Sequence, residues 1–210
     1  SIGNRAFRDM VNLESVTFGA DVATTGYEVF YNCTALTSVT LNEGLTEIGS
    51  FAFSNTAIAE ITLPSTLVKL NNRAFKNCAS LTYISVPDSV TYVGYEEFMG
   101  CTSLTGFKWT AGYSYINGVT FSGCTSLAEI TVSPDNKNYS SVDGVLFNKD
   151  GSELIVYPKG NGRSAYTVPD GVTSIGDSAF SGCTSLVEIV IPDSVTSIGG
   201  FAFSGCTSLS

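Results

Sequence analysis

The sequence predicts a solenoid, a right-handed superhelix of coils of about 23 residues with one short parallel β-strand per coil. Its main support is a repeat in which an apolar residue opens a new unit at Leu13, Leu36, Ile58, Leu81, Leu104, Leu127, Leu186 and Leu209. Successive openings are 22 or 23 residues apart except for one interval of 59, which holds one repeat plus an insertion of 36 residues. Units of this length cannot bury an apolar face alone, so they are expected to stack on one another.

The opening of each unit predicts the strand. The pattern Leu-x-x-Ile-x-Ile, seen at Leu186, Ile189 and Ile191, alternates as a short strand with one buried face does. Proline follows in several units and ends the strand, because it has no N–H to donate: Pro64, Pro87, Pro169 and Pro192. One strand per coil would form a parallel sheet on the concave side.

A regular phenylalanine predicts the convex side. Each of these residues is preceded four positions earlier by Gly, or by Asn at Asn71 and Asn117, and both residue types tolerate a positive φ. We therefore expect a left-handed backbone at that position. The phenylalanines are expected to stack as a buried column on turns and short helical or 3₁₀ segments, and they are Phe7, Phe30, Phe53, Phe75, Phe98, Phe121, Phe180 and Phe203.

Six cysteines share one repeat position, which Met10 and Asn55 occupy in other units: Cys33, Cys78, Cys101, Cys124, Cys183 and Cys206. Because the position accepts Met, the main prediction is buried, reduced thiols that pack as small hydrophobic groups. Disulfides between adjacent coils remain the alternative, since a coil spacing of about 4.8 Å lies within the allowed Cα separation. Zinc binding is disfavoured because no paired C-x-x-C motif is present.

Residues 133–165 form the insertion and predict a β-hairpin. Two β-rich runs, 142–147 and 153–158, flank the turn residues Asn148-Lys149-Asp150-Gly151. The strand-end pattern resumes at Tyr166-Thr167-Val168-Pro169, so the array is expected to continue in register. We predict a single repeat domain over residues 1–210, as part of a longer array or multidomain protein.

Composition argues against several functions. The chain has no histidine, which removes Ser-His-Asp, Cys-His and His-metal chemistry. Its net charge of −9 disfavours binding to nucleic acid or anionic lipid, and no apolar run approaches the roughly 20 residues that span a bilayer. We therefore predict no enzymatic activity, no cofactor, no metal, no nucleic-acid partner and no membrane insertion by this segment.

An adjacent pair of glutamates and an aromatic cluster are both expected to have structural roles only. Glu96 and Glu97 are expected to form a solvated pair on a convex turn, without a pocket that would shift either pKa. Trp109, Tyr113 and Tyr115 make the fifth unit irregular, and they are expected to pack in the core.

The repeat resembles the leucine-rich repeat of the BspA-like family, also called the Treponema pallidum type. The resemblance is carried best by Ala-Phe-Ser-Gly-Cys-Thr-Ser-Leu at 179–186 and Ile-Pro-Asp-Ser-Val-Thr-Ser-Ile-Gly at 191–199, and it covers nearly the whole chain. It implies a leucine-rich-repeat solenoid that belongs to a secreted or cell-surface protein. It also implies an adhesive role, with extracellular or host proteins as the expected partners. Glycans are a further expected class of partner, because the concave face has few Tyr, Trp or Arg anchors.

The candidate binding residues are those that project from the concave sheet between buried positions. Most are small or hydroxylated, and the larger or charged ones are Glu60, Tyr83, Lys108, Glu129 and Glu188. Binding energy concentrates in Tyr, Trp and Arg anchors, so a face this short of them predicts weak or multivalent contacts. Two hypotheses remain, a non-catalytic protein-binding module and a structural spacer without a ligand of its own.

Overall fold

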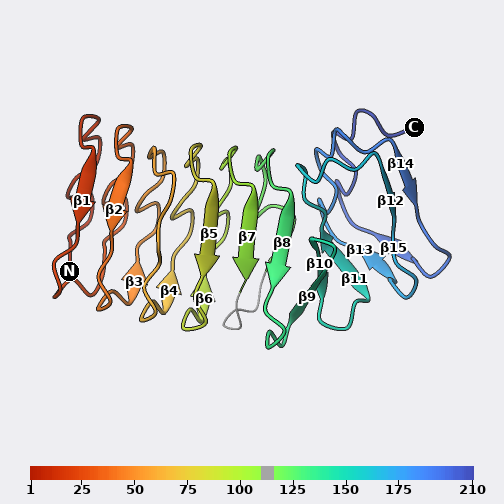
Figure 1. Ribbon diagram of the computed structural model, residues 1–210, viewed down its shortest axis with the longest axis horizontal. Coiled ribbons are helices and arrows are strands. Elements are labelled where there is room, and N and C mark those ends of the chain that lie inside the picture. Colours follow the sequence, from red (N-terminus) through yellow and green to blue (C-terminus); the bar gives the residue numbers. More distant parts are fainter. Residues whose placement is uncertain (110–115) are drawn as a thin grey trace.

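The computed structural model describes residues 1–109 and 116–210 and shows an elongated β-solenoid of about eight coils (Figure 1). The N-terminus lies at one end of the long axis, and the C-terminal coils lie at the other. Tyr113 and Tyr115 lie outside the described residues, whereas Trp109 is buried as expected. The described residues include no helix that is long and apolar enough to cross a membrane.

Within residues 1–109 and 116–210 the regular structure consists of fifteen short strands: β1 (Ser15–Thr17), β2 (Ser38–Thr40), β3 (Glu47–Ile48), β4 (Lys69–Leu70), β5 (Tyr83–Val86), β6 (Tyr92–Val93), β7 (Gly106–Trp109), β8 (Glu129–Val132), β9 (Tyr139–Val142), β10 (Val145–Asn148), β11 (Glu153–Val156), β12 (Ala165–Thr167), β13 (Ser174–Ile175), β14 (Glu188–Val190) and β15 (Ser197–Ile198).

The predicted strand column is confirmed. It consists of three parallel groups, β1–β2, β5–β7–β8 and β12–β14, in which equivalent repeat positions are paired. Ile84, Phe107 and Ile130 form one such row of buried residues, because every strand turns the same face toward the core. The coil that opens at Ile58 contributes only an isolated bridge, between Glu60 and Tyr83.

The expectation of one strand per coil was wrong. A second parallel column forms from two-residue strands, in the groups β3–β4–β6 and β13–β15, and β13 also pairs with β11. Its inward residues, such as Ile48, Leu70 and Val93, are buried. The second half of the repeat, which reads Val-x-x-Ile as at Val195 and Ile198, therefore forms backbone pairs between coils just as the opening half does.

The phenylalanine column is present, and its residues lie on turns. No helical or 3₁₀ segment occurs among the described residues, so the expected helical segments were wrong. Successive rings stack almost in parallel at centroid separations of 5.0–6.2 Å. At the insertion Tyr157 takes the place of a phenylalanine, since its ring stacks on Phe180 at 5.0 Å and its N–H donates to the Ala179 carbonyl.

The repeated glycine has a different role from the one predicted. Positive φ occurs two residues later, as at Glu28 (φ 55°) and Phe51 (φ 57°), and not at the glycine itself. The glycine is needed because the backbones of adjacent coils approach closely there. A Cβ added to Gly49 would lie 2.2 Å from the carbonyl oxygen of Gly26.

The predicted burial of the cysteine column is confirmed for five thiols, and Cys206 is partly buried. Thr56, rather than Asn55, occupies the position in the 22-residue unit, where its hydroxyl lies 3.4 Å from Cys78 Sγ. Each thiol donates to a backbone carbonyl of the preceding coil, as Cys124 does to Phe98 at 3.0 Å. Burial raises the pKa of Cys78 to about 11 and that of Cys124 to about 12, so these thiols stay protonated at neutral pH.

The insertion contains the predicted hairpin, β10–β11, and one strand more. β9 pairs with β10 through the two-residue turn Asp143-Gly144, where both residues have positive φ. Strands β10 and β11 of the resulting antiparallel sheet are buried on both faces. Leu146 and Ile155 pack with the N-terminal core, whereas Val145, Phe147 and Leu154 pack with the C-terminal core, so the hydrophobic interior consists of two clusters with the insertion between them.

Candidate functional site

Four of the five predicted binding residues share one exposed surface, the outer face of β5, β7 and β8 and of the neighbouring coil that opens at Ile58. Glu60 pairs with Tyr83, Tyr83 with Gly106, and Gly106 with Glu129, so these positions form one row across the coils. Lys108 lies in the next row, between Ser85 and Thr131. All four side chains are exposed, as predicted for this face.

Glu188 does not join this group. It is exposed on β14 and pairs there with Ala165 of β12, in a sheet that the insertion separates from β8. The five predicted residues therefore do not make one site.

Tyr83 is the most prominent side chain of the shared surface, with 48% of its area exposed. Its ring lies over Gly106, because a Cβ added to that glycine would be 3.4 Å from Tyr83 Cδ2. The missing side chain in the next coil thus gives the ring a flat backbone surface to rest on. This support limits the ring's freedom and leaves its other face open to a ligand.

A groove runs beside Tyr83, and sequence reasoning missed it. Two adjoining hollows share Glu60, Ile61 and Thr62, and together we call them the strand-face groove, lined also by Val39, Thr40, Leu41, Glu43, Leu63, Pro64, Tyr83, Ser85 and Pro87. It follows the coil that opens at Ile58, which has no strand in the opening column and lies between β2 and β5. The sequence marks this coil only by the 22-residue spacing from Leu36 to Ile58.

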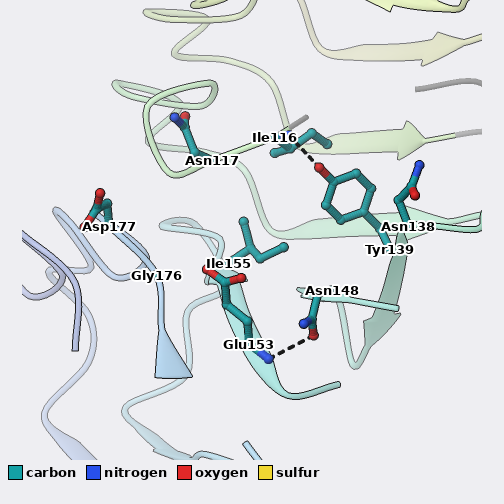
Figure 2. A pocket seen from close by; sticks show the side chains of 9 residues that line it. All are labelled: Ile116, Asn117, Asn138, Tyr139, Asn148, Glu153, Ile155, Gly176 and Asp177. Carbon is teal, nitrogen blue, oxygen red and sulfur yellow. Dashed lines mark hydrogen bonds between the residues drawn. The ribbon is translucent and has the colours of Figure 1, made fainter. Parts of the chain in front are cut away.

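A second hollow, the insertion pocket, was also absent from the sequence predictions. Nine residues line about 340 Å³: Ile116, Asn117, Asn138, Tyr139, Asn148, Glu153, Ile155, Gly176 and Asp177. Figure 2 shows Ile116 and Asn117 at the top, Tyr139 and Asn138 at the right, Glu153 and Asn148 at the bottom, and Gly176 and Asp177 at the left. The Tyr139 hydroxyl accepts a hydrogen bond from the Ile116 N–H at 2.9 Å, which fixes one wall.

The prediction for Glu96 and Glu97 was wrong for both residues. Glu96 is paired with Arg73 at 2.9 Å and Lys76 at 3.0 Å, and the hydrogen bonds from these cations lower its pKa to about 2. Glu97 is buried, and neither carboxyl oxygen has a hydrogen-bond partner among the described residues. Its desolvation raises the pKa to about 8.

Most basic side chains on the convex side form ion pairs or lie over aromatic rings of neighbouring coils. Arg5 and Arg8 both pair with Glu28, and Arg5 lies over the Tyr27 ring at 4.7 Å. Arg73 lies over Tyr95 at 4.5 Å as well as pairing with Glu96. These contacts join adjacent turns and so support the coil stacking.

None of the described residues forms a group of three or more Asp, Glu, Cys or His side chains placed to hold a metal ion. The buried thiols are protonated at neutral pH, as their raised pKa values indicate, and so they lack the thiolate character of nucleophilic cysteines. The strand-face groove combines an exposed aromatic ring with aliphatic and hydroxyl groups. Such a lining suits non-covalent recognition.

Solved structures with the same architecture come from several bacteria. A leucine-rich repeat protein from Eubacterium ventriosum matches 96% of this chain and 60% of its own, with 24% identity and a TM-score of 0.79. A leucine rich cell surface protein from Faecalibacterium prausnitzii matches 100% of this chain and 63% of its own, with 29% identity and a TM-score of 0.69. The T. pallidum leucine rich repeat protein matches 100% and 71%, with 24% identity and a TM-score of 0.53.

The chain thus spans 60% and 63% of the first two of these proteins. No curated protein matches it. The model of the BspA type leucine rich repeat region matches in six copies, over residues 1–128, 46–163 and 159–210. This family consists of repeat scaffolds that are generally non-catalytic and generally mediate protein interactions. Since the matches extend from the first residue to the last, the chain belongs to the BspA type leucine-rich repeat family.

Proposed function

We propose that the chain is a non-catalytic protein-binding module of a secreted or cell-surface protein, and that it binds through the strand-face groove beside Tyr83. The observation that carries the proposal is the exposed Tyr83 ring, supported from below by Gly106 and open to the groove. Extracellular or host proteins are the proposed partners, and glycans are the second class to test. The surface location is supported by the F. prausnitzii protein, which is described as a cell surface protein.

The groove has the composition of a small recognition site. Leu63 and Pro87 supply apolar area, while Thr62 and Ser85 supply hydroxyl groups that can donate or accept hydrogen bonds. Tyrosine is enriched among the residues that dominate interface energies, because a rigid ring buries much area at little entropic cost. A partner that covers Tyr83 would therefore gain most of its affinity there.

Lys108 gives the same surface a charge that can select partners. Its ammonium group projects one row away from Tyr83 and is exposed, in a chain whose net charge is −9. Exposed charges at the rim of an interface change association rates and selectivity more than they change the final affinity. We therefore expect acidic groups on the partner opposite Lys108.

A panel of immobilised extracellular-matrix proteins, serum proteins and glycans tests the proposal. For each ligand found, Tyr83→Ala should weaken binding at least about tenfold, since interface tyrosines often contribute 2 kcal/mol or more. Lys108→Glu should slow association most at low salt. The matched control is Tyr92→Ala, which removes an equally exposed tyrosine from β6 in the other strand column.

All variants should keep the melting temperature of the parent chain, because the altered side chains are exposed. If no ligand binds, or if Tyr83→Ala and Tyr92→Ala bind as well as the parent, the strand-face groove is not a recognition site. The structural-spacer hypothesis would then replace it.

A further inference from the structure

The insertion pocket exists because the coil that contains the insertion lacks a convex turn. Leu154 of β11 pairs with Ile175 of β13, and four residues separate Ile175 from Phe180, whereas only two separate Leu154 from Tyr157. The shorter segment leaves no residues to form a convex turn in the coil that contains the insertion. Gly118 of the preceding coil contacts Asp177 of the following one directly, since a Cβ on Gly118 would lie 2.7 Å from the Asp177 carbonyl oxygen.

The space that remains has an apolar floor. Ile116, Tyr139 and Ile155 are buried side chains that line it, and they come from three different segments of the chain. Aliphatic and aromatic groups of this kind can contact a methylene chain, but they offer nothing to a small hydrated ion.

The polar part of the lining combines three asparagines with two carboxylates, those of Glu153 and Asp177, and includes no basic residue. Glu153 lies beside the apolar floor, with Oε1 only 3.2 Å from the position of a Cβ on Gly176. Asp177 stands at the exposed rim, where Oδ1 accepts a hydrogen bond from the Gly200 N–H at 2.6 Å. Across the part of the chain that the structure describes, neither carboxylate is in an ion pair.

The unpaired state of these two carboxylates differs from the pairing of carboxylates on the convex side. Glu28 and Glu96 are also partly buried, and each is paired with two cations from neighbouring residues. The carboxylate of Glu153 has no hydrogen bond or ion pair within the described chain, although it lies in a partly enclosed hollow. A cation supplied from outside would meet an uncompensated negative potential that the low-dielectric walls strengthen.

From these contacts we propose that the insertion pocket binds a primary ammonium group on an alkyl chain, such as a lysine side chain presented by a partner. The methylene stem would pack on Ile116 and Ile155, and the ammonium group would meet the carboxylate of Glu153, with Asp177 at the entrance. The volume of about 340 Å³ is sufficient for such a side chain. This site is separate from the strand-face groove and does not depend on the function proposed for it.

Binding of N-acetyl-lysine methylamide to the whole chain, followed by NMR chemical-shift changes, tests the proposal. The expected result is saturable binding that shifts the amide signals of residues 116–117, 153–155 and 176–177. Glu153→Gln should weaken it at least about tenfold, because removing the charge leaves the shape of the pocket unchanged. The matched control, Glu14→Gln next to β1, removes an exposed carboxylate far along the chain from the pocket and should leave the affinity unchanged.

Two further probes separate charge from shape. The norleucine analogue has nearly the same stem without the ammonium group, and it should bind at least about tenfold more weakly than the lysine analogue. Equal binding of both analogues, or no binding of either, would overturn the proposal. Calcium that binds the parent but not Glu153→Gln, with no competition from the lysine analogue, would also overturn it and make the pocket a metal site. Melting curves of each variant confirm that the chain remains folded.

Discussion

Glu97 is the residue that departs most from the repeat. The equivalent position before the column phenylalanine is alanine in the two preceding coils, Ala52 and Ala74, and both are buried. Glu97 keeps the same inward direction and buries its carboxyl group without a hydrogen-bond partner in the described chain. Aligning Glu97 with these alanines would have predicted its burial, whereas considering Glu96 and Glu97 as adjacent residues on a turn did not.

The raised pKa of Glu97 makes stability depend on pH. Its pKa is about 8 in the folded chain against 4.5 when unperturbed, so between these values the folded state binds the extra proton and stability falls as pH rises. Above about pH 8 this contribution is fully lost. We expect Glu97→Gln to be more stable than the parent at pH 9 by about 2–4 kcal/mol, measured by urea unfolding, with a smaller difference at pH 5.

Glu96→Gln is the control for this pH dependence. Because the pKa of Glu96 is lowered to about 2, its contribution is present above pH 4.5 and is lost as pH falls toward 2. The pH dependence of stability should therefore change between about pH 4.5 and 8 in Glu97→Gln, and between about pH 2 and 4.5 in Glu96→Gln. An unchanged slope between pH 5 and 9 in Glu97→Gln would show that the buried carboxyl group does not control alkaline stability.

At the scale of structural elements, the repeated glycine permits the close stacking of coils. Gly49→Ala should destabilise the chain by about 1–3 kcal/mol, because the new Cβ would lie 2.2 Å from the Gly26 carbonyl oxygen and the coils would have to separate. Gly3→Ala is the matched control at the same repeat position, where nothing lies within 4 Å of the added Cβ. Equal melting temperatures for the two variants would contradict a role in close packing.

The phenylalanine column is the main apolar element of the convex side. Phe98 is fully buried and stacks on Phe75 and Phe121, so Phe98→Ala should cost about 3–5 kcal/mol in unfolding free energy. Phe201 is 79% exposed, and Phe201→Ala should cost less than about 0.5 kcal/mol. Urea denaturation measures both, and a loss below about 1 kcal/mol in Phe98→Ala would contradict its place in the column.

Elements defined by side-chain periodicity were predictable, and those defined by backbone pairing were not. The opening strands and the phenylalanine column each leave an apolar residue at a fixed repeat position, as Ile130 and Phe98 do. The second strand column consists of two-residue strands such as β4, which are too short to show alternation. The strand-face groove and the insertion pocket lie where the array is irregular, at a coil without an opening strand and at a coil without a convex turn, and their shape depends on how neighbouring coils pack.

At the scale of the whole molecule, the insertion divides the solenoid core. The first cluster extends from Phe18 to Val156, and the second from Val145 to Ala202, with the two faces of the β9–β10–β11 sheet contributing to different clusters. Solenoid stability is the sum of the stability of each coil and of its contacts with its neighbours. A sheet that replaces a regular coil therefore makes the interface between the clusters different from every other interface in the array.

Because the core is divided, we expect a mutation on one side of the insertion to reduce stability mainly on that side. Val172 is fully buried in the C-terminal cluster, and Val172→Ala should cost about 2 kcal/mol. Native-state hydrogen exchange should then show reduced protection in β12–β15, while β5 and β7 keep the protection they have in the parent chain. Ile84→Val, in the N-terminal cluster, is the reciprocal variant and should lower protection mainly in β5, β7 and β8. An equal loss of protection on both sides in either variant would mean that the insertion sheet transmits stability fully, and that the array unfolds as one cooperative unit.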